Sequence, residues 1–225
     1  MKKTENVSRI ERNYTTVTSS PIFVDLKTAR FYGKRFKIIF DFFLAVILLT
    51  VSAPFLVIIS LLVKLDSKGP IFFRQIRLGK NSQQYSLIKF RTMVQNAEQK
   101  SGPIWTKEND SRITSIGKWL RRFYLDEIPQ LINVLKGEMS IIGPRPERPF
   151  FVKKLIREYP YYLDRLSIKP GMTGFAQINQ SYDRNINDVR KKLEFDCFYI
   201  EHLSFMLDLK ILMKTVFVMV LGKGR

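Results

Sequence analysis

The sequence predicts an α+β fold that is mostly helical and attached to a membrane, and three observations predict it. A run of 22 uncharged residues, 42–63, is long and apolar enough to enter a bilayer as a helix. Two β-prone runs joined by a turn indicate a small hairpin. Most of the remaining chain spaces its apolar residues with a helical period.

Composition restricts the classes of protein that this chain can belong to. Its 225 residues suffice for one domain, or one domain with an appendage. The 38 Lys and Arg against 20 Asp and Glu give a formal charge of +18, which indicates a polyanionic partner or an anionic surface. The single cysteine, Cys197, excludes an intramolecular disulfide and a CxxC site, and the single histidine, His202, excludes an HExxH site. P-loop, GxGxxG, GxSxG, zinc-finger and RRM signatures are absent, so nucleic acid is not an expected partner.

The N-terminal half of the chain divides into a tail and a membrane segment. Residues 1–33 are polar and unpatterned, as in a loosely attached tail. The membrane segment is expected over 34–66, and Pro54 near its middle removes a helical hydrogen bond and kinks the helix. Basic residues flank the apolar run on both sides, and the positive-inside rule would keep both flanks in the cytoplasm. A re-entrant helix that bends at Pro54 satisfies both signals, and a kinked single-pass helix is the alternative.

Residues 67–225 are expected to form a cytoplasmic domain. The β-prone runs 71–77 and 84–93 flank a Gly/Asn/Ser turn and predict the hairpin. A short helix is expected at 94–100. Helical patterns follow at 116–125 and, after DEIP, at 130–137, which Gly137 closes, and then at 148–166, at 186–203 and at 204–225. The last pattern is apolar with a few charges, typical of a helix in the membrane interface or of a core helix with snorkelling lysines.

Three short segments carry residue types that suit a site for phosphate groups. Asp126 and Glu127 are adjacent carboxylates followed by a proline that favours a first helical turn, and helix capping by Asp126 is the ordinary alternative. Arg145 lies between two prolines in GPRPER (143–148), a rigid mount for a guanidinium, and a solvated loop arginine is the alternative. KPGMTGFAQIN (169–179) has glycines that let backbone N–H groups approach a phosphate, although ordinary turns look the same.

Taken together and in order, these segments resemble the bacterial sugar transferase family, the monotopic phosphoglycosyl transferases. The resemblance covers about residues 34–222 and rests on long stretches: KRFKIIFDFFLAV (34–46), KLDSKGPIFFRQIRLGK (64–80), LIKFRTM (87–93), LRRFYLDEIPQLINVLKGEMSIIGPRPE (120–147), KPGMTGFAQIN (169–179) and DLKILMKT (208–215). The family's helix-breaking Ser-Pro appears here as Ser52-Ala53-Pro54, which keeps the proline and shifts the serine. The four-helix N-terminal module of the larger members is missing, so the chain is similar to the small catalytic-only form.

The resemblance implies a reaction and a set of residues. Members transfer a sugar-1-phosphate from a UDP-sugar to a polyprenyl phosphate, usually undecaprenyl phosphate, release UMP and need Mg²⁺. Asp126 is then the expected nucleophile of a covalent aspartyl-phosphosugar intermediate, which is chemically sound because a carboxylate can attack phosphorus. Glu127 is the expected metal ligand, since Mg²⁺ would bridge the diphosphate oxygens. The cations expected at phosphate or uridine groups are Lys89, Arg91, Arg121 and Arg145.

The same resemblance places the protein at the cytoplasmic face of the bacterial inner membrane, initiating the assembly of an exopolysaccharide, capsule, O-antigen or glycoprotein glycan.

Lys89 and Arg91 flank Phe90 on the predicted strand and so share a face, for which a solvated surface is the alternative. Membrane lipids are expected partners, and a homodimer is left open. A non-catalytic adaptor that binds anionic lipid through its basic surface is the competing hypothesis; it predicts no dependence on Asp126, Glu127 or Mg²⁺.

Overall fold

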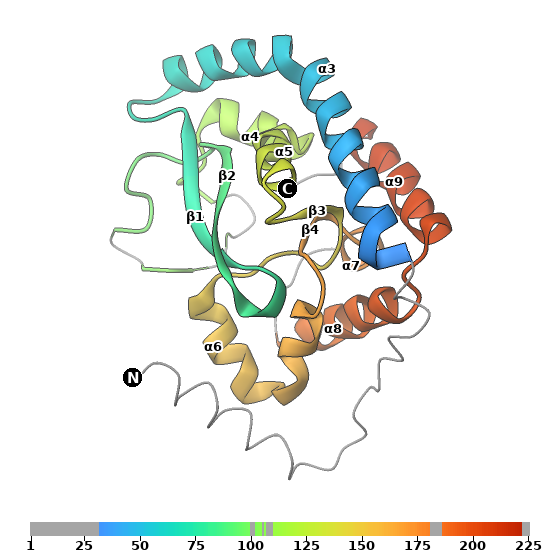
Figure 1. The fold of residues 1–225 in the computed structure, drawn as a ribbon. Coiled ribbons are helices and arrows are strands. Elements are labelled where there is room, and N and C mark those ends of the chain that lie inside the picture. The colour runs from blue at the N-terminus through green and yellow to red at the C-terminus, as the bar shows by residue number, and fades with distance from the viewer. Residues whose placement is uncertain (1–31, 100–101, 105, 107–109, 181–185, 222–225) are drawn as a thin grey trace, which may run out of the picture.

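The computed structural model describes residues 32–99, 102–104, 106, 110–180 and 186–221. All but the last two residues of the predicted tail lie outside these ranges. The described α-helices are α3 (Lys37–Asp66), α4 (Ser115–Arg122), α5 (Leu131–Leu135), α6 (Pro149–Glu158), α7 (Phe175–Asn179), α8 (Ile186–Glu201) and α9 (Phe205–Val220). The strands are β1 (Phe72–Leu78), β2 (Gln84–Phe90), β3 (Ser140–Ile142) and β4 (Gly171–Thr173), and the 3₁₀ segments include η4 (Leu125–Gln130) and η5 (Pro160–Leu166). The mostly helical α+β architecture with a small hairpin is therefore confirmed (Figure 1).

The predicted hairpin is present as the antiparallel pair β1–β2. Its register sets Phe72 opposite Phe90 and Leu78 opposite Gln84. Asn81 and Ser82 in the turn have φ angles of 53° and 60°, a left-handed conformation that short polar residues tolerate better than bulky ones. Most of β2 is buried against helices, whereas most of β1 is exposed, so β2 is the strand that carries side chains into the interior.

A second sheet was not predicted. Strands β3 and β4 pair in parallel, with Ser140 opposite Gly171 and Ile142 opposite Thr173. Gly143 and Gly171 lie back to back: a Cβ atom on Gly171 would come within 2.0 Å of the backbone nitrogen of Gly143. The glycines around 169–174 thus serve a close approach of two backbones, which joins that segment to GPRPER.

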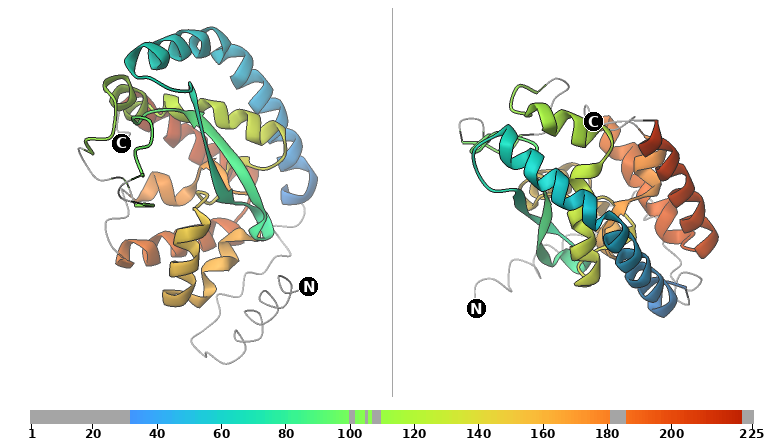
Figure 2. Two further views of the ribbon diagram at one scale, coloured as in Figure 1. Left: turned by 90° about the vertical axis from the view of Figure 1, so that its left-hand side faces the viewer. Right: turned by 90° about the horizontal axis from the view of Figure 1, so that it is seen from above.

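Helix α3 changes direction along its length, and Figures 1 and 2 show its two halves at an angle. Pro54 lies inside it and has no N–H group to offer to the preceding turn, which accounts for the bend. Only 11% of the most apolar stretch of α3 is buried inside the structure, and the helix is long and apolar enough to cross a bilayer. Among the described residues it is the one helix that meets this criterion.

Both halves of α3 pack on the domain that follows it. Ala45, in the first half, belongs to a core cluster that also contains Leu131 of α5 and Ile211 of α9. Ile59 and Val63, in the second half, belong to another cluster, together with Phe90 of β2 and Leu120 of α4. The domain therefore holds the helix at both ends.

A buried polar cluster links the start of α3 to α9. The Lys37 ammonium lies 2.7 Å from a carboxylate oxygen of Asp208 and 3.6 Å from one of Asp41. The hydroxyl groups of Tyr32 and Tyr199 also donate to Asp208, at 2.9 and 2.6 Å. Asp208 is fully buried, so these three donors compensate the loss of its hydration.

Other sequence predictions need correction. Residues 95–99 form turns rather than the helix expected at 94–100. The single helix expected at 148–166 is two elements, because α6 ends before Pro160, which begins the 3₁₀ segment η5. Pro129 lies within η4 instead of opening a helix, and α5 begins two residues later. Gly137 does close α5 as expected, with a φ of 77°.

Candidate active site

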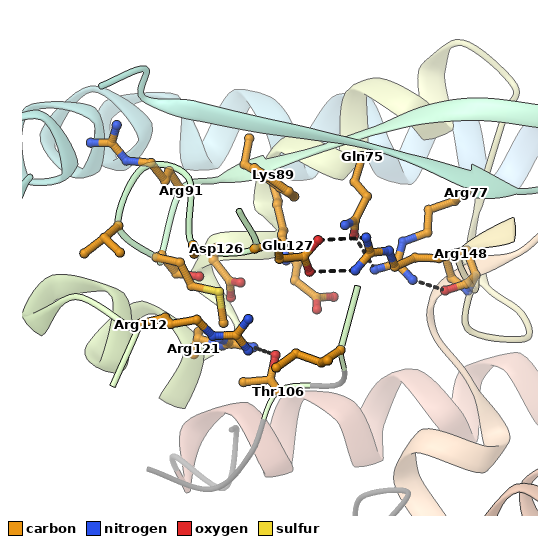
Figure 3. Close-up of a pocket in the computed structure, with 18 of the residues that line it drawn as sticks. Gln75, Arg77, Lys89, Arg91, Thr106, Arg112, Arg121, Asp126, Glu127 and Arg148 are labelled. Carbon is orange, nitrogen blue, oxygen red and sulfur yellow. Dashed lines mark hydrogen bonds and ion pairs between the residues drawn. The ribbon is translucent and has the colours of Figure 1, made fainter. Parts of the chain in front are cut away.

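The hairpin, η4 and the GPRPER segment together enclose a cavity of about 600 Å³. Asp126 and Glu127 come from η4, Lys89 from β2, and Arg145 from the loop after β3. Figure 3 shows the two carboxylates side by side at the centre of the cavity, with Lys89 approaching from the strand above them. Arg121 and Arg91 also line this cavity, so segments far apart in the sequence bring all six predicted catalytic and substrate-binding residues to one pocket.

Asp126 is 5% exposed, and the backbone around it places its carboxylate at the cavity wall. Tyr124, at the cap position of η4, has a φ of 57°, so the chain turns sharply just before the acidic pair. The residue that caps this segment is therefore Tyr124, and the capping role weighed for Asp126 is not the arrangement found.

The electrostatic environment of Asp126 combines two opposing effects. Burial raises the pKa of its carboxyl group above the ordinary value, and the negative charge of Glu127 raises it further. Three surrounding cations act in the opposite direction: Lys89, Arg121 and Arg145. Any further positive charge, such as a metal ion, would favour the ionised form that a nucleophile must have.

Glu127 is held by Arg145 through a two-pronged ion pair. The guanidinium Nη1 and Nη2 atoms donate to the two carboxylate oxygens at 3.2 and 2.5 Å. Glu127 raises the pKa of Arg145 by its charge, so this arginine is permanently protonated. Their side chains are 12% and 28% exposed, respectively, so the pair lies at the cavity surface, where Arg145 could also contact a ligand.

Lys89 and Arg121 extend the positive wall of the cavity. Burial lowers the pKa of Lys89 to about 8, although Asp126 raises it. Lys89 also lies over the ring of Phe73, 5.4 Å from its centre. Arg121 is 7% exposed and donates to the hydroxyl of Thr106 at 3.4 Å. Both cations are positioned to interact with an anion bound beside the carboxylates.

Arg91 lines the cavity, but its guanidinium is engaged by the end of α3. Its guanidinium donates to the carbonyls of Val63, Ser67 and Lys68, at 3.3, 2.6 and 3.0 Å, around the end of α3. Figure 3 shows it pointing away from the carboxylate pair. Arg91 therefore satisfies carbonyls at a helix C-terminus, a role that the alternation around Phe90 did not reveal.

Sequence reasoning did not single out several cavity residues. Arg148 makes a two-pronged pair with Glu98 across the cavity, at 2.6 and 2.8 Å. Arg77 pairs with Glu147 at 2.9 Å. The sequence could have pointed to these residues. Glu147 and Arg148 belong to the GPRPER segment itself, and Arg77 lies two residues after Gln75 and so on the same face of the strand.

Asp126 and Glu127 are compatible with an Mg²⁺ site only if the substrate and water supply the other ligands. Among the residues that the structure describes, no group of three or more His, Cys, Asp or Glu side chains could hold a metal. Mg²⁺ in phosphate-transfer sites commonly takes one or two protein carboxylates and completes its coordination with substrate phosphates and water. Asp126 and Glu127 fit that donor set, since a diphosphate would supply the remaining oxygens.

A family model described as bacterial sugar transferase matches residues 32–222. A UDP-N-acetylgalactosamine-undecaprenyl-phosphate N-acetylgalactosaminephosphotransferase of Aeromonas hydrophila is 41% identical over 184 residues, 82% of this chain and 43% of that protein. A UDP-glucose:undecaprenyl-phosphate glucose-1-phosphate transferase of Klebsiella pneumoniae is 39% identical over 81% of this chain and 39% of that protein. An exopolysaccharide production protein, PSS, of Rhizobium leguminosarum bv. phaseoli is 40% identical over 79% of this chain and 91% of that protein. The match thus spans less than half the length of the first two relatives and most of the third.

Proposed function

Since this chain belongs to the bacterial sugar transferase family, we propose that it transfers a sugar-1-phosphate from a UDP-sugar to undecaprenyl phosphate and releases UMP. The observation that carries the proposal is the acidic pair Asp126–Glu127 at the wall of a cavity with cationic side chains around it. A diphosphate needs positive charge around it, and the transfer needs a nucleophile beside it. The names of two relatives state this type of reaction with two different sugars, so the sugar used by this chain stays open.

We further propose that the reaction proceeds in two steps through Asp126. In the first step a carboxylate oxygen of Asp126 attacks the β-phosphorus, and the bond from that phosphorus to the bridging oxygen breaks, so UMP leaves with the bonding electrons. In the second step an oxygen of undecaprenyl phosphate attacks the same phosphorus and Asp126 leaves as a free carboxylate. Arg145 and Arg121 stabilise the charge on the phosphoryl oxygens in both steps.

Glu127 and Asp126 are the residues that would hold Mg²⁺. The ion supplies charge neutralisation of the diphosphate when it is bound. Arg145 orients Glu127 through its two hydrogen bonds, so the carboxylate is already fixed before substrate binds. This pre-organisation reduces the entropy cost of assembling the site.

The arrangement of α3 supports a re-entrant topology at the cytoplasmic face of the inner membrane. Lys37 and Ala45 near its start, and Val63 near its end, all contact the one domain that carries the cavity. A straight helix across a hydrocarbon core of about 30 Å would place its two ends on opposite sides. A bent helix that returns to its own side keeps the cavity near the bilayer, where the lipid substrate is confined.

The experiment that tests the function is UMP release by the full chain in lipid nanodiscs, with undecaprenyl phosphate, Mg²⁺ and a panel of UDP-sugars. We expect release with at least one donor, and loss of turnover in Asp126→Asn, because an amide does not form the acyl phosphate. With lipid omitted, intact-mass measurement should show an adduct of the sugar phosphate on the wild-type protein. The matched control is Asp164→Asn, which changes an acidic residue outside the cavity lining and should leave turnover intact.

The possible results separate the alternatives. Sequential kinetics without an adduct would contradict the two-step route while the transferase function stands. A lipid-binding adaptor would associate with anionic vesicles but release no UMP with any donor. That result would refute the proposed function.

A further inference from the structure

The segment 144–147, which carries Arg145, is held at each of its four carbonyl groups. The Gly171 N–H donates to the carbonyl of Pro144 and the Leu78 N–H to that of Glu147, both at 3.0 Å. The other two carbonyls accept from guanidinium groups: that of Arg145 from the buried Arg165 at 2.9 Å, and that of Pro146 from the partly buried Arg77 at 3.3 Å. Two donors at the end of β1 and two within 165–171 thus hold a segment that has no regular secondary structure.

Arg165 lies outside the cavity lining, and every nitrogen of its guanidinium donates a hydrogen bond. Its Nε donates to Asp196 at 2.8 Å, its Nη1 to the hydroxyl of Tyr162 at 2.9 Å, and its Nη2 to the carbonyl of Arg145. The side chains of Arg165 and Asp196 are 1% and 2% exposed. Neither residue lines the cavity, and the hydrogen bond from Arg165 to the site is the one to the backbone of Arg145.

A buried ion pair of this kind is a poor way to gain stability. Removing two charges from water costs several kcal/mol per ion, and well-packed apolar side chains often serve stability as well or better. The pair does fix the orientation of its partners, because a guanidinium fork sets the plane and position of each acceptor that it contacts. The acceptor here belongs to the residue whose own guanidinium holds Glu127.

We propose that Arg165, anchored by Asp196, is a positioning residue for the transfer: it holds the carbonyl of Arg145 and so sets the guanidinium of Arg145 against Glu127. This inference rests on the proposed function. A displacement of about 1 Å in a catalytic group can cost up to about 10²-fold in rate. Loss of this hydrogen bond would allow a displacement of that kind without removing any group that touches the substrate.

The test replaces Arg165 by lysine, which keeps a positive charge for Asp196 but has no planar fork to serve three partners at once. We expect kcat for UMP release to fall by about 10²-fold. In an Arg145→Ala background, Arg165→Lys should cause little further loss, because the side chain that it positions is already absent. The control is Tyr162→Phe, which removes a different hydrogen bond from the same guanidinium and should leave kcat within a few-fold of wild type.

Two outcomes would overturn the inference. One is an equal loss of kcat from Arg165→Lys in the wild-type and Arg145→Ala backgrounds. The other is a loss in Tyr162→Phe as large as that in Arg165→Lys, which would indicate a general effect on stability. If Arg165→Lys does not fold, Asp196→Asn takes its place in the same cycle; an unchanged kcat in that variant would also refute the inference.

Hydrogen exchange separates this inference from the proposed function. Amide deuterium uptake in a peptide covering 143–148 should rise in Arg165→Lys and not in Tyr162→Phe. A wild-type protein that releases no UMP would refute the proposed function, whereas equal uptake in the two variants would refute the positioning role by itself.

Discussion

At the scale of single residues, the cavity depends on how much positive charge it keeps near the acidic pair. Lys89 is the cation whose charge changes within the accessible pH range, because burial lowers its pKa to about 8. Below that value its ammonium adds to the field that attracts a diphosphate, and above it the charge is lost. Arg121 and Arg145 stay charged throughout.

The first residue-scale prediction concerns pH. UMP release by the wild type should fall as the pH rises through about 8, since Lys89 loses its proton there. Lys89→Arg keeps its charge, so kcat/KM should remain on a plateau to a pH at least one unit higher. Lys192→Arg, at another cavity lysine, is the matched control and should retain the wild-type alkaline limb. An alkaline limb that is identical in Lys89→Arg would contradict the assignment.

Some of the residues that line the cavity could be singled out from the sequence by their local chemistry. Asp126, Glu127 and Arg145 lie in short segments with unusual composition, and the structure brings them into one cavity. The contacts of the Arg91 guanidinium could not be predicted, because strand alternation gives the face of a side chain but not what covers that face. Here the end of α3, more than twenty residues earlier in the chain, covers it.

At the scale of elements, one arginine joins the membrane helix to the strand that carries Lys89. The carbonyls of Val63, Ser67 and Lys68 have no further helical turn to bond with, and Arg91 supplies their donors. The N–H of Ile116 also donates to Asp66 at the end of α3, at 3.1 Å. The C-terminal half of the helix is thus tied to both β2 and α4.

The element-scale prediction follows from this connection. Arg91→Ala leaves one buried and two partly buried carbonyls without their charged donor, which should lower the free energy of unfolding by roughly 2–4 kcal/mol. Chemical unfolding in detergent micelles measures it. Arg74→Ala, at an exposed arginine of β1, should change stability by no more than about 0.5 kcal/mol. If Arg91 instead binds substrate, its replacement would raise KM for the UDP-sugar at unchanged stability.

Elements could be predicted from sequence where their signal is continuous. Helix α3 has an unbroken apolar run, and the hairpin has a clear turn between two β-prone runs, so both were found. The pair β3–β4 was missed because each strand has three residues and its partner lies about thirty residues away. The division of 148–166 at Pro160 was missed because the helical apolar spacing continues past the proline.

At the scale of the whole molecule, both ends of α3 pack on the one domain that carries the cavity. Figure 2 shows the bent helix running along one side of the fold. The exposed apolar side chains of α9, such as Met213 and Phe217, add to the apolar surface of α3. We expect these two helices to form the membrane-facing side, because together they expose the longest apolar surfaces among the described helices.

The prediction at this scale is that single cysteines at both ends of α3 lie on the cytoplasmic side. Arg35→Cys and Lys68→Cys, both at exposed positions, should react with an impermeant maleimide in inverted membrane vesicles and not in intact spheroplasts. The native Cys197 is buried and should give little background in either preparation. Opposite accessibility of the two sites would show that the helix crosses the membrane.

The ion pair between Lys37 and Asp208 can form only late in the synthesis of the protein. The two residues are separated by 171 positions, and a ribosome that adds about 5–20 residues per second needs roughly 10–30 s to pass from one to the other. During that interval α3 has already been made, and, among the described residues, Lys37 has only the carboxylate of Asp41, in its own helix, as an ion-pair partner. The contact between the start of α3 and α9 therefore forms only after translation of α9, and a transcript truncated before Asp208 would yield a chain that lacks this ion pair but keeps the packing of α3 against β2 and α4.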